Sequence, residues 1–454
     1  MGMRTLLSPT PNYLASLVNE LRQCLMAPDF IARHRVRPQD FTRHRQLTFP
    51  VIMLFVLQKT VKSIQNHLHA FLKELAGEEI FEPVTAGAVT HARAKLKHTA
   101  FVELNEQIVL PAFYSPGRQE PLRRWRGHRL LGIDSSLVRL PNGQELLEKF
   151  TVVETSNGRG KSGICYPEAR MSVVYDLLNH IGLDARLEPS SLGEIDLAIE
   201  QLKRVKAGDV LITDRGFTSY EYLAWHHRLG LDYIARCSTA SFAAAQELFR
   251  INRANRSIVV KLVPPSNQRA RLRQLGLPLE LVVRFVGVRL STGELEVLAT
   301  SLLAQERYPT EEFLEVYHYR WGHETFYGRM KGRLDLENFS GETVEAVRQD
   351  FFASLLLGNL ETALTQPAAQ ALSEQSLEDK YRKQVNHAVA YHAMKGRLLQ
   401  LLYSELPAEK VVQELQKLFL TSPVSVRPER KPPRRQPSLN RSYHFQRRVR
   451  KIVF

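Results

Sequence analysis

Apolar residues recur at helical spacing through the first hundred or so residues of the chain. The stretch 47–75 places them at every third or fourth position, and Pro50 falls in its first turn, where a proline is tolerated. The segments 85–96 and 100–113 predict two further short helices. These patterns predict a helical N-terminal region over residues 1–125.

Beyond this region the pattern changes to short apolar runs that alternate with helical ones. The runs 128–134 and 209–214 each predict a strand that ends in a carboxylate, Asp134 and Asp214. The predicted order over residues 126–237 is one strand, two paired strands, helix, strand, helix, strand. Such an alternation is typical of an α/β sheet.

A β-rich segment follows at residues 238–305. Its apolar runs predict strands at 257–263, 279–290 and 294–303, with a turn between the last two. The segment therefore reads as an insertion between the sheet and the next helical stretch.

The last part of the chain is predicted to be mainly helical. One helix is expected over 313–334, although its three glycines weaken it, and a strongly apolar one over 343–364. Residues 306–365 are assigned to the same domain as the sheet. The remainder, 366–454, is predicted to contain helices and to end in a basic, Pro- and Arg-rich tail at 427–450.

Length and charge narrow the class of protein. The 454 residues are enough for two or three domains, and 62 Lys and Arg against 47 Asp and Glu give a net charge of +15. An excess of this size points to a polyanionic partner, most simply nucleic acid, although a generally basic protein would show the same number.

Cysteines and apolar runs exclude some other classes. The three cysteines are widely spaced and form no Cys-x-x-Cys pair, so a disulfide framework or a zinc module is not expected. The longest apolar run near the start, 51–57, is too short to cross a bilayer, and no signal peptide is evident. We expect a cytoplasmic protein.

The predicted helix 313–334 carries an unusual set of side chains. At about 100° per residue, Tyr317, Arg320, Glu324 and Lys331 project within roughly 60° of one another. One face therefore combines a carboxylate, two cations and a phenol. A salt-bridged surface helix is the alternative interpretation.

Three distant acidic residues can converge on this face. Asp134 and Asp214 lie at predicted strand ends, where sites form in open α/β sheets, and Glu324 lies on the helix. Three carboxylates repel one another unless hard cations such as Mg²⁺ neutralise them. Two such ions about 3.5–4 Å apart can activate an attacking oxygen and stabilise the leaving oxygen of a phosphodiester.

The N-terminal region offers candidate DNA contacts. Arg93 and Lys95 lie on the short predicted helix 85–96, among small residues that would suit a helix in a major groove. A short connecting helix with a solvated face is the alternative. Two other patterns are weaker candidates for a functional site. His226 and His227 are not at helical metal-ligand spacing, so a packed or solvated role is favoured over metal binding. Residues 158–162 resemble a phosphate-binding loop but lack its first glycine.

The spacing Tyr317-x2-Arg320-x3-Glu324-x6-Lys331 resembles the Tyr-Arg-Glu-Lys signature of DDE transposases of the insertion-sequence-four type, which bacterial insertion sequences encode. Asp134 in Gly-Ile-Asp-Ser resembles that family's first acidic position. Asp214 in Thr-Asp-Arg-Gly-Phe resembles the second.

The resemblance implies an RNase H-like catalytic domain split by a β-strand insertion, in a homodimer that brings two transposon ends together. Asp134, Asp214 and Glu324 would hold two Mg²⁺ ions, with Mn²⁺ able to substitute. The enzyme would cut double-stranded DNA at the terminal inverted repeats, pass through a hairpin in members that work this way, and join the ends to target DNA.

The resemblance also implies roles in DNA binding. Tyr317, Arg320 and Lys331 would contact phosphates near the transposon end, where a base is flipped out of the stack. Some relatives stack that base on a tryptophan of the insertion, which this insertion lacks; Phe285 or Tyr308 would have to replace it.

Two other functions remain open from the sequence. One is a metal-dependent nuclease on the same fold that cuts DNA without joining it. The other is a non-catalytic repressor or domesticated relative that holds transposon ends, against which the three intact acidic positions argue.

Overall fold

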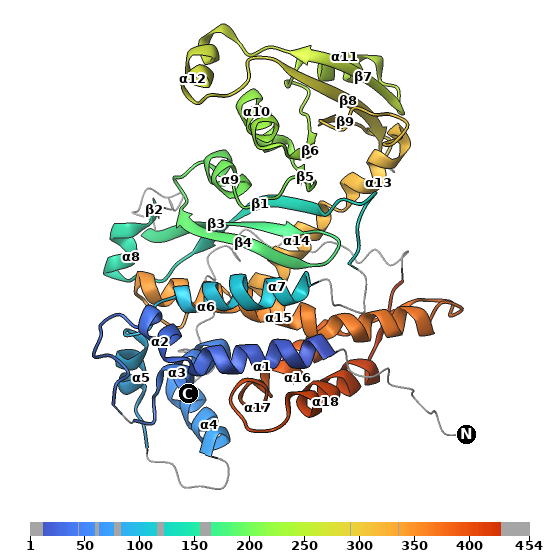
Figure 1. Ribbon diagram of the computed structural model, residues 1–454. Helices are drawn as coiled ribbons and strands as arrows, with labels where there is room; N and C mark the ends of the chain where they lie inside the picture. The colour runs from blue at the N-terminus through green and yellow to red at the C-terminus, as the bar shows by residue number, and fades with distance from the viewer. Residues whose placement is uncertain are drawn as a thin grey trace, which may run out of the picture. The chain divides into compact units, whose positions relative to one another are not determined.

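The computed structural model describes residues 12–43, 45–59, 63–76, 83–115, 122–154, 165–290, 292–334 and 336–427. The chain divides into two compact units (Figure 1). One comprises Met1–Pro121, Arg139–Pro167 and Met330–Phe454, and the other Leu122–Val138 and Glu168–Arg329. The five-part division expected from the sequence stays a prediction.

A mixed β-sheet forms the centre of the second unit. Its strands lie in the order β3-β1-β5-β6-β9-β8-β7, and β4 pairs with β3 off this path. Strands β1, β5 and β6 pair in parallel, whereas β3 and β4 are antiparallel. Five of its strands are β1 (Leu130–Arg139), β3 (Cys165–Asp176), β4 (Ile181–Pro189), β5 (Val210–Thr213) and β6 (Asp232–Arg236). The predicted α/β class is therefore confirmed.

The insertion extends this sheet. β9 (Leu295–Thr300) pairs antiparallel with β6, and β8 (Leu281–Arg289) and β7 (Arg256–Leu262) follow outward. The three predicted strands are present. Two helices that the pattern did not predict, α11 (Ala243–Ile251) and α12 (Arg269–Gln274), accompany them.

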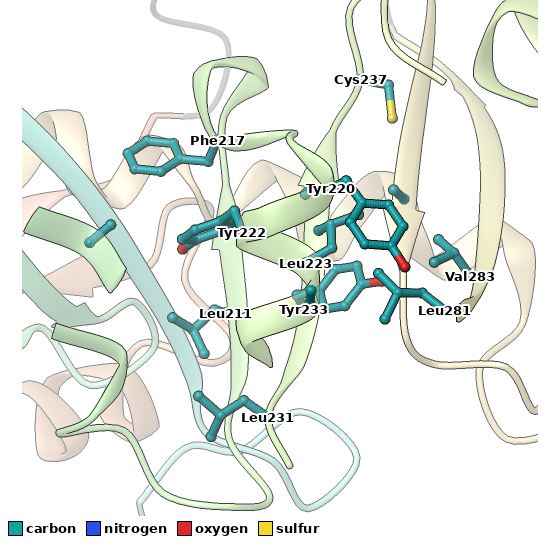
Figure 2. Close-up of a cluster of buried hydrophobic side chains, with 14 of the residues drawn as sticks. Leu211, Phe217, Tyr220, Tyr222, Leu223, Leu231, Tyr233, Cys237, Leu281 and Val283 are labelled. Carbon is teal, nitrogen blue, oxygen red and sulfur yellow. The ribbon is translucent and has the colours of Figure 1, made fainter. Parts of the chain in front are cut away.

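An apolar core lies between the sheet and the helices of this unit (Figure 2). The helices α9 (Glu194–Leu202) and α10 (Tyr220–Leu229) contribute to it. Leu211 of β5 and Leu223 of α10 are both fully buried, and each such side chain contributes about 1.5–3 kcal/mol. Gly230 ends α10 in the left-handed conformation, at φ 66°, which a glycine adopts without strain. The core fixes the sheet on which the acidic residues lie.

Helices make up most of the first unit. The helix α15 (Val344–Gln375) runs for 32 residues and contacts α3, α6, α16 and α18 (Figure 1). The other helices are α1 (Asn12–Met26), α2 (Pro28–His34), α3 (Phe49–Leu57), α4 (Ile64–Ala76), α5 (Ala86–Arg93), α6 (Thr99–Leu104), α7 (Leu110–Phe113), α8 (Gln144–Lys149), α16 (His387–Lys395), α17 (Leu398–Leu402) and α18 (Ala408–Thr421).

Short elements complete this unit. A π-helix at Asn105–Val109 joins α6 to α7. β2 (Thr151–Glu154) adjoins β3, whose first residues belong to the same unit, and β10 (Lys383–Gln384) pairs with β11 (Val424–Ser425). The predicted basic tail lies almost entirely outside the described residues. Within them, no helix has both the length and the apolar character needed to cross a membrane.

Candidate active site

Two acidic residues and an arginine form a row across the three parallel strands. Gly132 pairs with Ile212, so that two residues further on Asp134 of β1 is level with Asp214. Strands β5 and β6 pair as far as residue 213, which sets Arg236 level with Asp214. Since neighbouring strands lie about 4.8 Å apart, the three residues occupy adjacent positions at one edge. This register supports the prediction that the carboxylates of Asp134 and Asp214 lie close together.

The two aspartates differ in their backbone setting. Asp134 was expected to end its strand, but β1 continues to Arg139, so this boundary was wrong. Asp214 does follow the end of β5 and caps the short 3₁₀ helix Arg215–Phe217, whose first backbone N–H donates to its Oδ1 at 2.8 Å.

The predicted helix 313–334 is broken into three pieces. α13 (Phe313–His318) and α14 (Trp321–Gly328) are separated by a turn, and a π-helix, Arg329–Arg333, follows. The expectation of one straight helix was therefore wrong. Glycines are weak helix formers, and a tight turn or a π-bulge redirects a helix where packing demands it.

Arg320 links the acidic residues of the second unit. Its Nη2 donates to Oε1 of Glu324 at 3.1 Å, and only 7% of Arg320 is exposed. The hydroxyl of Tyr317 donates to Oδ1 of Asp214 at 3.4 Å, a long bond, and the guanidinium lies 5.9 Å from the Tyr317 ring. Burial alone would lower the pKa of Arg320. Tyr317, the charge of Asp214, and the hydrogen bond and charge of Glu324 outweigh burial and raise this pKa above its ordinary value.

Two buried contacts fix α14 against β1. A Cβ at Gly132 would lie 2.6 Å from Nδ1 of His323, so only glycine lets the helix approach this closely. The hydroxyl of Tyr327 donates to the backbone carbonyl of Asp134 at 2.6 Å. These contacts hold Glu324, the residue next to His323, near the acidic edge of the sheet.

The environment of Asp134 opposes its negative charge. Burial is the main reason why the pKa of Asp134 is raised to about 6, and the carboxylates of Glu194 and Asp214 raise it further. The backbone N–H of Ser135 and the charge of Arg320 act in the opposite direction. The site therefore has more negative charge than its own cations balance.

Arg236 and Glu296 belong to the same edge and were not identified from the sequence. Nη1 of Arg236 lies 3.7 Å from Oδ1 of Asp214, and its Nη2 lies 2.7 Å from Oε1 of the buried Glu296. Arg236 is the last residue of a predicted strand, and its place at the same carboxyl edge was the available signal.

Glu194 and Ser135 form a second group that sequence reasoning missed. The Ser135 hydroxyl donates to Oε1 of Glu194 at 2.5 Å and accepts from Nη1 of Arg170 at 2.9 Å. Glu194 is the first residue of α9. In the sequence it could not be told apart from the other acidic residues near the start of this helix. Only the packing of α9 beside β1 distinguishes it.

Lys331 belongs to the first unit. Its Nζ lies 3.4 Å from Oε1 of Glu337. Its predicted place on one face with Tyr317, Arg320 and Glu324 stays a prediction.

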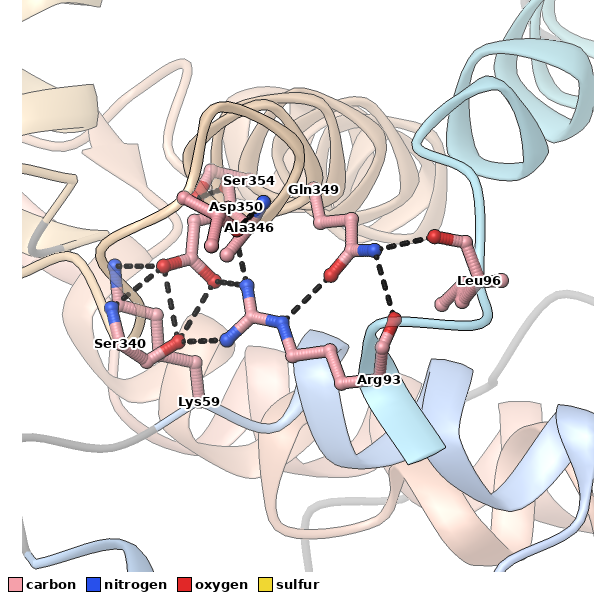
Figure 3. Close-up of polar contacts among 9 residues, drawn as sticks. Lys59, Arg93, Leu96, Ser340, Ala346, Gln349, Asp350 and Ser354 are labelled. Atoms are coloured by element: carbon pink, nitrogen blue, oxygen red, sulfur yellow. Dashed lines mark hydrogen bonds and ion pairs between the residues drawn. The ribbon is translucent and has the colours of Figure 1, made fainter. Parts of the chain in front are cut away.

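The structure gives Arg93 a role different from the predicted DNA contact (Figure 3). Only 8% of Arg93 is exposed, and it donates to Oε1 of Gln349 at 2.6 Å, Oγ of Ser340 at 2.5 Å and Oδ1 of Asp350 at 2.8 Å. A buried carboxylate needs such a partner, which is why this arginine is drawn inward. Lys95 is only partly buried, and its contact with DNA stays a prediction.

The charge balance of this cluster confirms its structural character. Burial acts to raise the pKa of Asp350, but Arg93 and Lys59 outweigh it and hold the pKa below its ordinary value. Asp350 is therefore ionised and anchors α15 to the end of α5.

The two aromatic residues considered for base stacking are both buried. Phe285 is fully buried within the apolar core, and Tyr308 is 6% exposed with its hydroxyl 2.7 Å from Nε2 of His128. The suggestion that either stacks on a flipped base was wrong, since neither ring presents a face to solvent. The loop 158–162 lies outside the described residues.

The acidic residues share an edge without forming a closed set of ligands. In the part of the chain that the structure describes, no three His, Cys, Asp or Glu side chains are close enough together to hold a metal ion. Glu324 is the most open of the three, with 48% of its side chain exposed, against 37% for Asp214.

Comparison with known proteins gives this geometry a context. Residues 125–360 match the family described as transposase DDE domain. The chain belongs to this family. The match covers more than half of its residues and includes both aspartates and the Tyr-Arg-Glu-Lys segment.

Two curated relatives of this DDE-family chain come from Escherichia coli (strain K12). The transposase InsG for insertion sequence element IS4 is 26% identical over 250 residues, which are 53% of this chain and 53% of the relative. The putative transposase InsZ is 26% identical over 182 residues, 40% of this chain and 58% of the relative. The chain thus spans somewhat more than half the length of these relatives, and the predicted resemblance is confirmed.

Solved structures show more distant likeness. The match to a chain of a piggyBac transposase synaptic complex with hairpin DNA covers 88% of this chain and 85% of that chain, at 10% identity and a TM-score of 0.41. The match to a chain of a Mos1 transposase paired-end complex with the left transposon end covers 40% of this chain and 75% of that chain, at 14% identity and a TM-score of 0.16.

Proposed function

We propose that this chain is a transposase that cuts DNA at transposon ends and joins the freed ends to target DNA, in a cut-and-paste reaction. One observation carries the proposal: Asp134 is level with Asp214 on adjacent parallel strands, and Arg320 ties Glu324 to the same edge. Family membership supplies the chemistry for which such a trio is suited.

We also infer that the second unit contains an RNase H-like sheet. The mixed sheet supports this inference, since its three parallel strands bring polar side chains to one carboxyl edge. The insertion enters after β6 and returns through β9 to the segment that carries Tyr317 and Glu324.

The donor set suits divalent cations. Asp134, Asp214 and Glu324 offer only carboxylate oxygens, which Mg²⁺ prefers. These residues would hold two Mg²⁺ ions, with Mn²⁺ able to substitute. When bound, such ions activate an attacking oxygen and stabilise the leaving oxygen of a phosphodiester.

The neighbouring side chains would position the DNA. Arg320 and Tyr317 already lie beside the carboxylates, so a phosphate drawn to this edge would meet a guanidinium and a phenol. Lys331 would contact a phosphate further along the strand. The inferred substrates are the terminal inverted repeats and target DNA, bound by a homodimer, with a flipped base and a hairpin at the cleaved end.

An end-labelled DNA carrying the terminal repeat, incubated with Mg²⁺ or with EDTA, tests this function. Joined product that requires Mg²⁺ is the expected result. Cut product without joining would assign a nuclease, and a bound complex without cutting would assign an end-binding repressor or domesticated relative.

A further inference from the structure

A basic surface forms in the first unit where the turn after α2 meets the segment after α5. The backbone N–H of Val36 donates to the carbonyl of Lys95 at 2.9 Å, and the N–H of Lys97 donates to the carbonyl of His34 at 2.8 Å. The two segments are distant in the sequence and belong to the same unit. They therefore run side by side and present their side chains together.

Buried groups fix the shape of the turn. Asp40 is 3% exposed, and its Oδ2 accepts from the backbone N–H of Arg37 at 2.9 Å. Phe41 takes the left-handed conformation, at φ 58°, and its ring packs edge-on against Phe49 at a centroid distance of 5.3 Å. A residue other than glycine keeps this conformation only where its surroundings require it. The side chains of the turn are therefore carried by a backbone that packing holds in one shape.

The charged side chains on this backbone are almost all cationic. Residues 35–45 and 95–97 contain one carboxylate, that of Asp40, which the turn itself uses. We call the cations of these two segments the basic turn: Arg35, Arg37, Arg43, Arg45, Lys95 and Lys97. Arg43 and Arg45 are exposed, and 62% of the Arg37 side chain is exposed.

Most of these cations are not neutralised from within the protein. Among the residues that the structure describes, no carboxylate forms a salt bridge with Arg43, Arg45 or Lys95. The nearby Arg33 differs, since it pairs with Glu103 and is not part of the basic turn. Like charges that are held close together repel one another, and a polyanion bound over them relieves this repulsion.

We propose that the basic turn binds the phosphate backbone of duplex DNA. This inference rests on the proposed function, because a transposase must hold DNA through groups other than its acidic residues. The helix α5 does not supply its own arginine, since Arg93 is bonded to Asp350 in the interior. Guanidinium groups on a fixed backbone suit this partner, because their N–H donors match the oxygens of a phosphate. The competing explanation is a solvated run of charge without a specific partner.

Salt titrations of matched variants separate these explanations. Arg43→Gln/Arg45→Gln removes two exposed charges of the basic turn, and Lys410→Gln/Lys417→Gln removes two exposed charges of α18 in the same unit. Fluorescence anisotropy on the full chain, in EDTA, measures binding to two labelled duplexes of equal length, one with the terminal repeat and one unrelated.

We expect Arg43→Gln/Arg45→Gln to weaken binding to both duplexes about tenfold and to reduce the slope of log affinity against log salt by about two. Both duplexes should respond alike, because contacts to phosphates carry no sequence information. Lys410→Gln/Lys417→Gln should keep the affinity and the slope of the wild type.

The other outcomes overturn the inference. Equal losses in the two variants would mean that the charge acts diffusely, and a loss confined to the terminal repeat would mean that the surface reads bases. A loss of affinity for duplex RNA without one for duplex DNA would assign the surface to RNA. If urea unfolding shows that Arg43→Gln/Arg45→Gln does not fold, Lys95→Gln/Lys97→Gln replaces it under the same criteria.

A joining assay on the wild-type chain separates this inference from the proposed function. Joined product beside an unchanged salt slope in Arg43→Gln/Arg45→Gln would refute only the role of the basic turn. A reduced slope in that variant, beside a wild-type chain that binds DNA and joins none, would refute only the proposed function.

Discussion

The charges of single residues decide which ligands can bind at the acidic edge, the edge of the sheet where Asp134, Asp214 and Glu324 lie. The Arg320 guanidinium bonds to Glu324 and contributes to the electrostatics of Asp134, and Arg236 lies 3.7 Å from Asp214, so two cations face the three carboxylates. Such an excess of negative charge is unfavourable in a partly buried place unless further cations bind. On the proposed function, bound divalent ions would relieve this excess of negative charge.

Glu324→Gln tests this assignment directly. The amide keeps the shape of the side chain and its contact with Arg320 but removes a negative oxygen, so we expect end binding to persist while cleavage falls by a factor of about a hundred or more. Gel shift and cleavage assays on the same DNA measure the two effects. Glu315→Gln, on α13, is a control; equal cleavage by the Glu324 variant would remove this residue from the site.

His226 gives the protein a sensitivity to acid. Its ring is fully buried and its Nδ1 lies 2.9 Å from the carbonyl of Tyr222, and burial lowers its pKa from 6.5 to about 4. A depressed histidine pKa means that the unfolded chain takes up the proton first. Stability from this residue is therefore present above pH 6.5 and lost as pH falls toward 4.

We expect this effect to cost about 2 kcal/mol between pH 7 and pH 5. Urea unfolding at both pH values measures it. In His226→Gln, which keeps a donor for the Tyr222 carbonyl, the difference between the two pH values should shrink by that amount. An identical pH dependence in the variant would mean that the ring is protonated as readily in the folded state as in the unfolded one.

At the scale of elements, the approach of α14 to β1 decides where Glu324 lies. The helix is too short to hold its position alone, and its buried contacts with Gly132 and with the Asp134 carbonyl replace what a longer helix would supply. The turn at Tyr319 and Arg320 lets α13 and α14 each follow its own packing surface.

Gly132→Ala should push α14 away from the sheet. The added methyl would meet His323 at 2.6 Å, so we expect a loss of about 1–3 kcal/mol in unfolding free energy and a larger loss of cleavage than of DNA binding. Gly328→Ala is the matched control, because a Cβ there meets nothing within 4 Å. If both variants behave alike, the close approach of α14 does not position Glu324.

The junction of α5 with α15 depends on a buried ion pair. Arg93→Ala would leave Asp350 ionised and without its main partner, and we expect a loss of about 3–5 kcal/mol in thermal or urea unfolding. Lys95→Ala, two residues away and partly exposed, should leave stability nearly unchanged. The opposite result, a stable Arg93→Ala chain with weaker DNA binding, would restore the DNA contact predicted from the sequence.

At the scale of the whole molecule, the net charge suits the DNA partner that we propose. A chain with +15 net charge attracts DNA regardless of sequence, and its acidic edge is a small exception within a basic protein.

DNA affinity should fall steeply with salt. If about six phosphates are neutralised, affinity drops about a thousandfold between 50 and 200 mM salt. Fluorescence anisotropy with labelled end DNA, in the presence of EDTA to prevent cleavage, measures the slope. A nearly flat dependence would show that the excess charge is not used for DNA.

The amino-acid sequence alone determined the kinds of element and the family. Period-two and period-3.6 patterns are local, so the strands β5 and β6, the helix α10 and the insertion strands follow from them. The motif residues keep fixed spacing along the chain, so the family signature was legible as well.

Tertiary structure decided what depends on contacts between distant residues. The sequence could not show that Arg93 would be buried by Asp350, 257 positions away, or that Glu194 would pack beside Asp134. It also could not show that one predicted helix would break at Tyr319, because helix propensity changes by less than a kilocalorie per residue and packing outweighs it. Burial and proximity arise only when the chain is folded, and they decide which charged residues support the fold and which are left for the ligand.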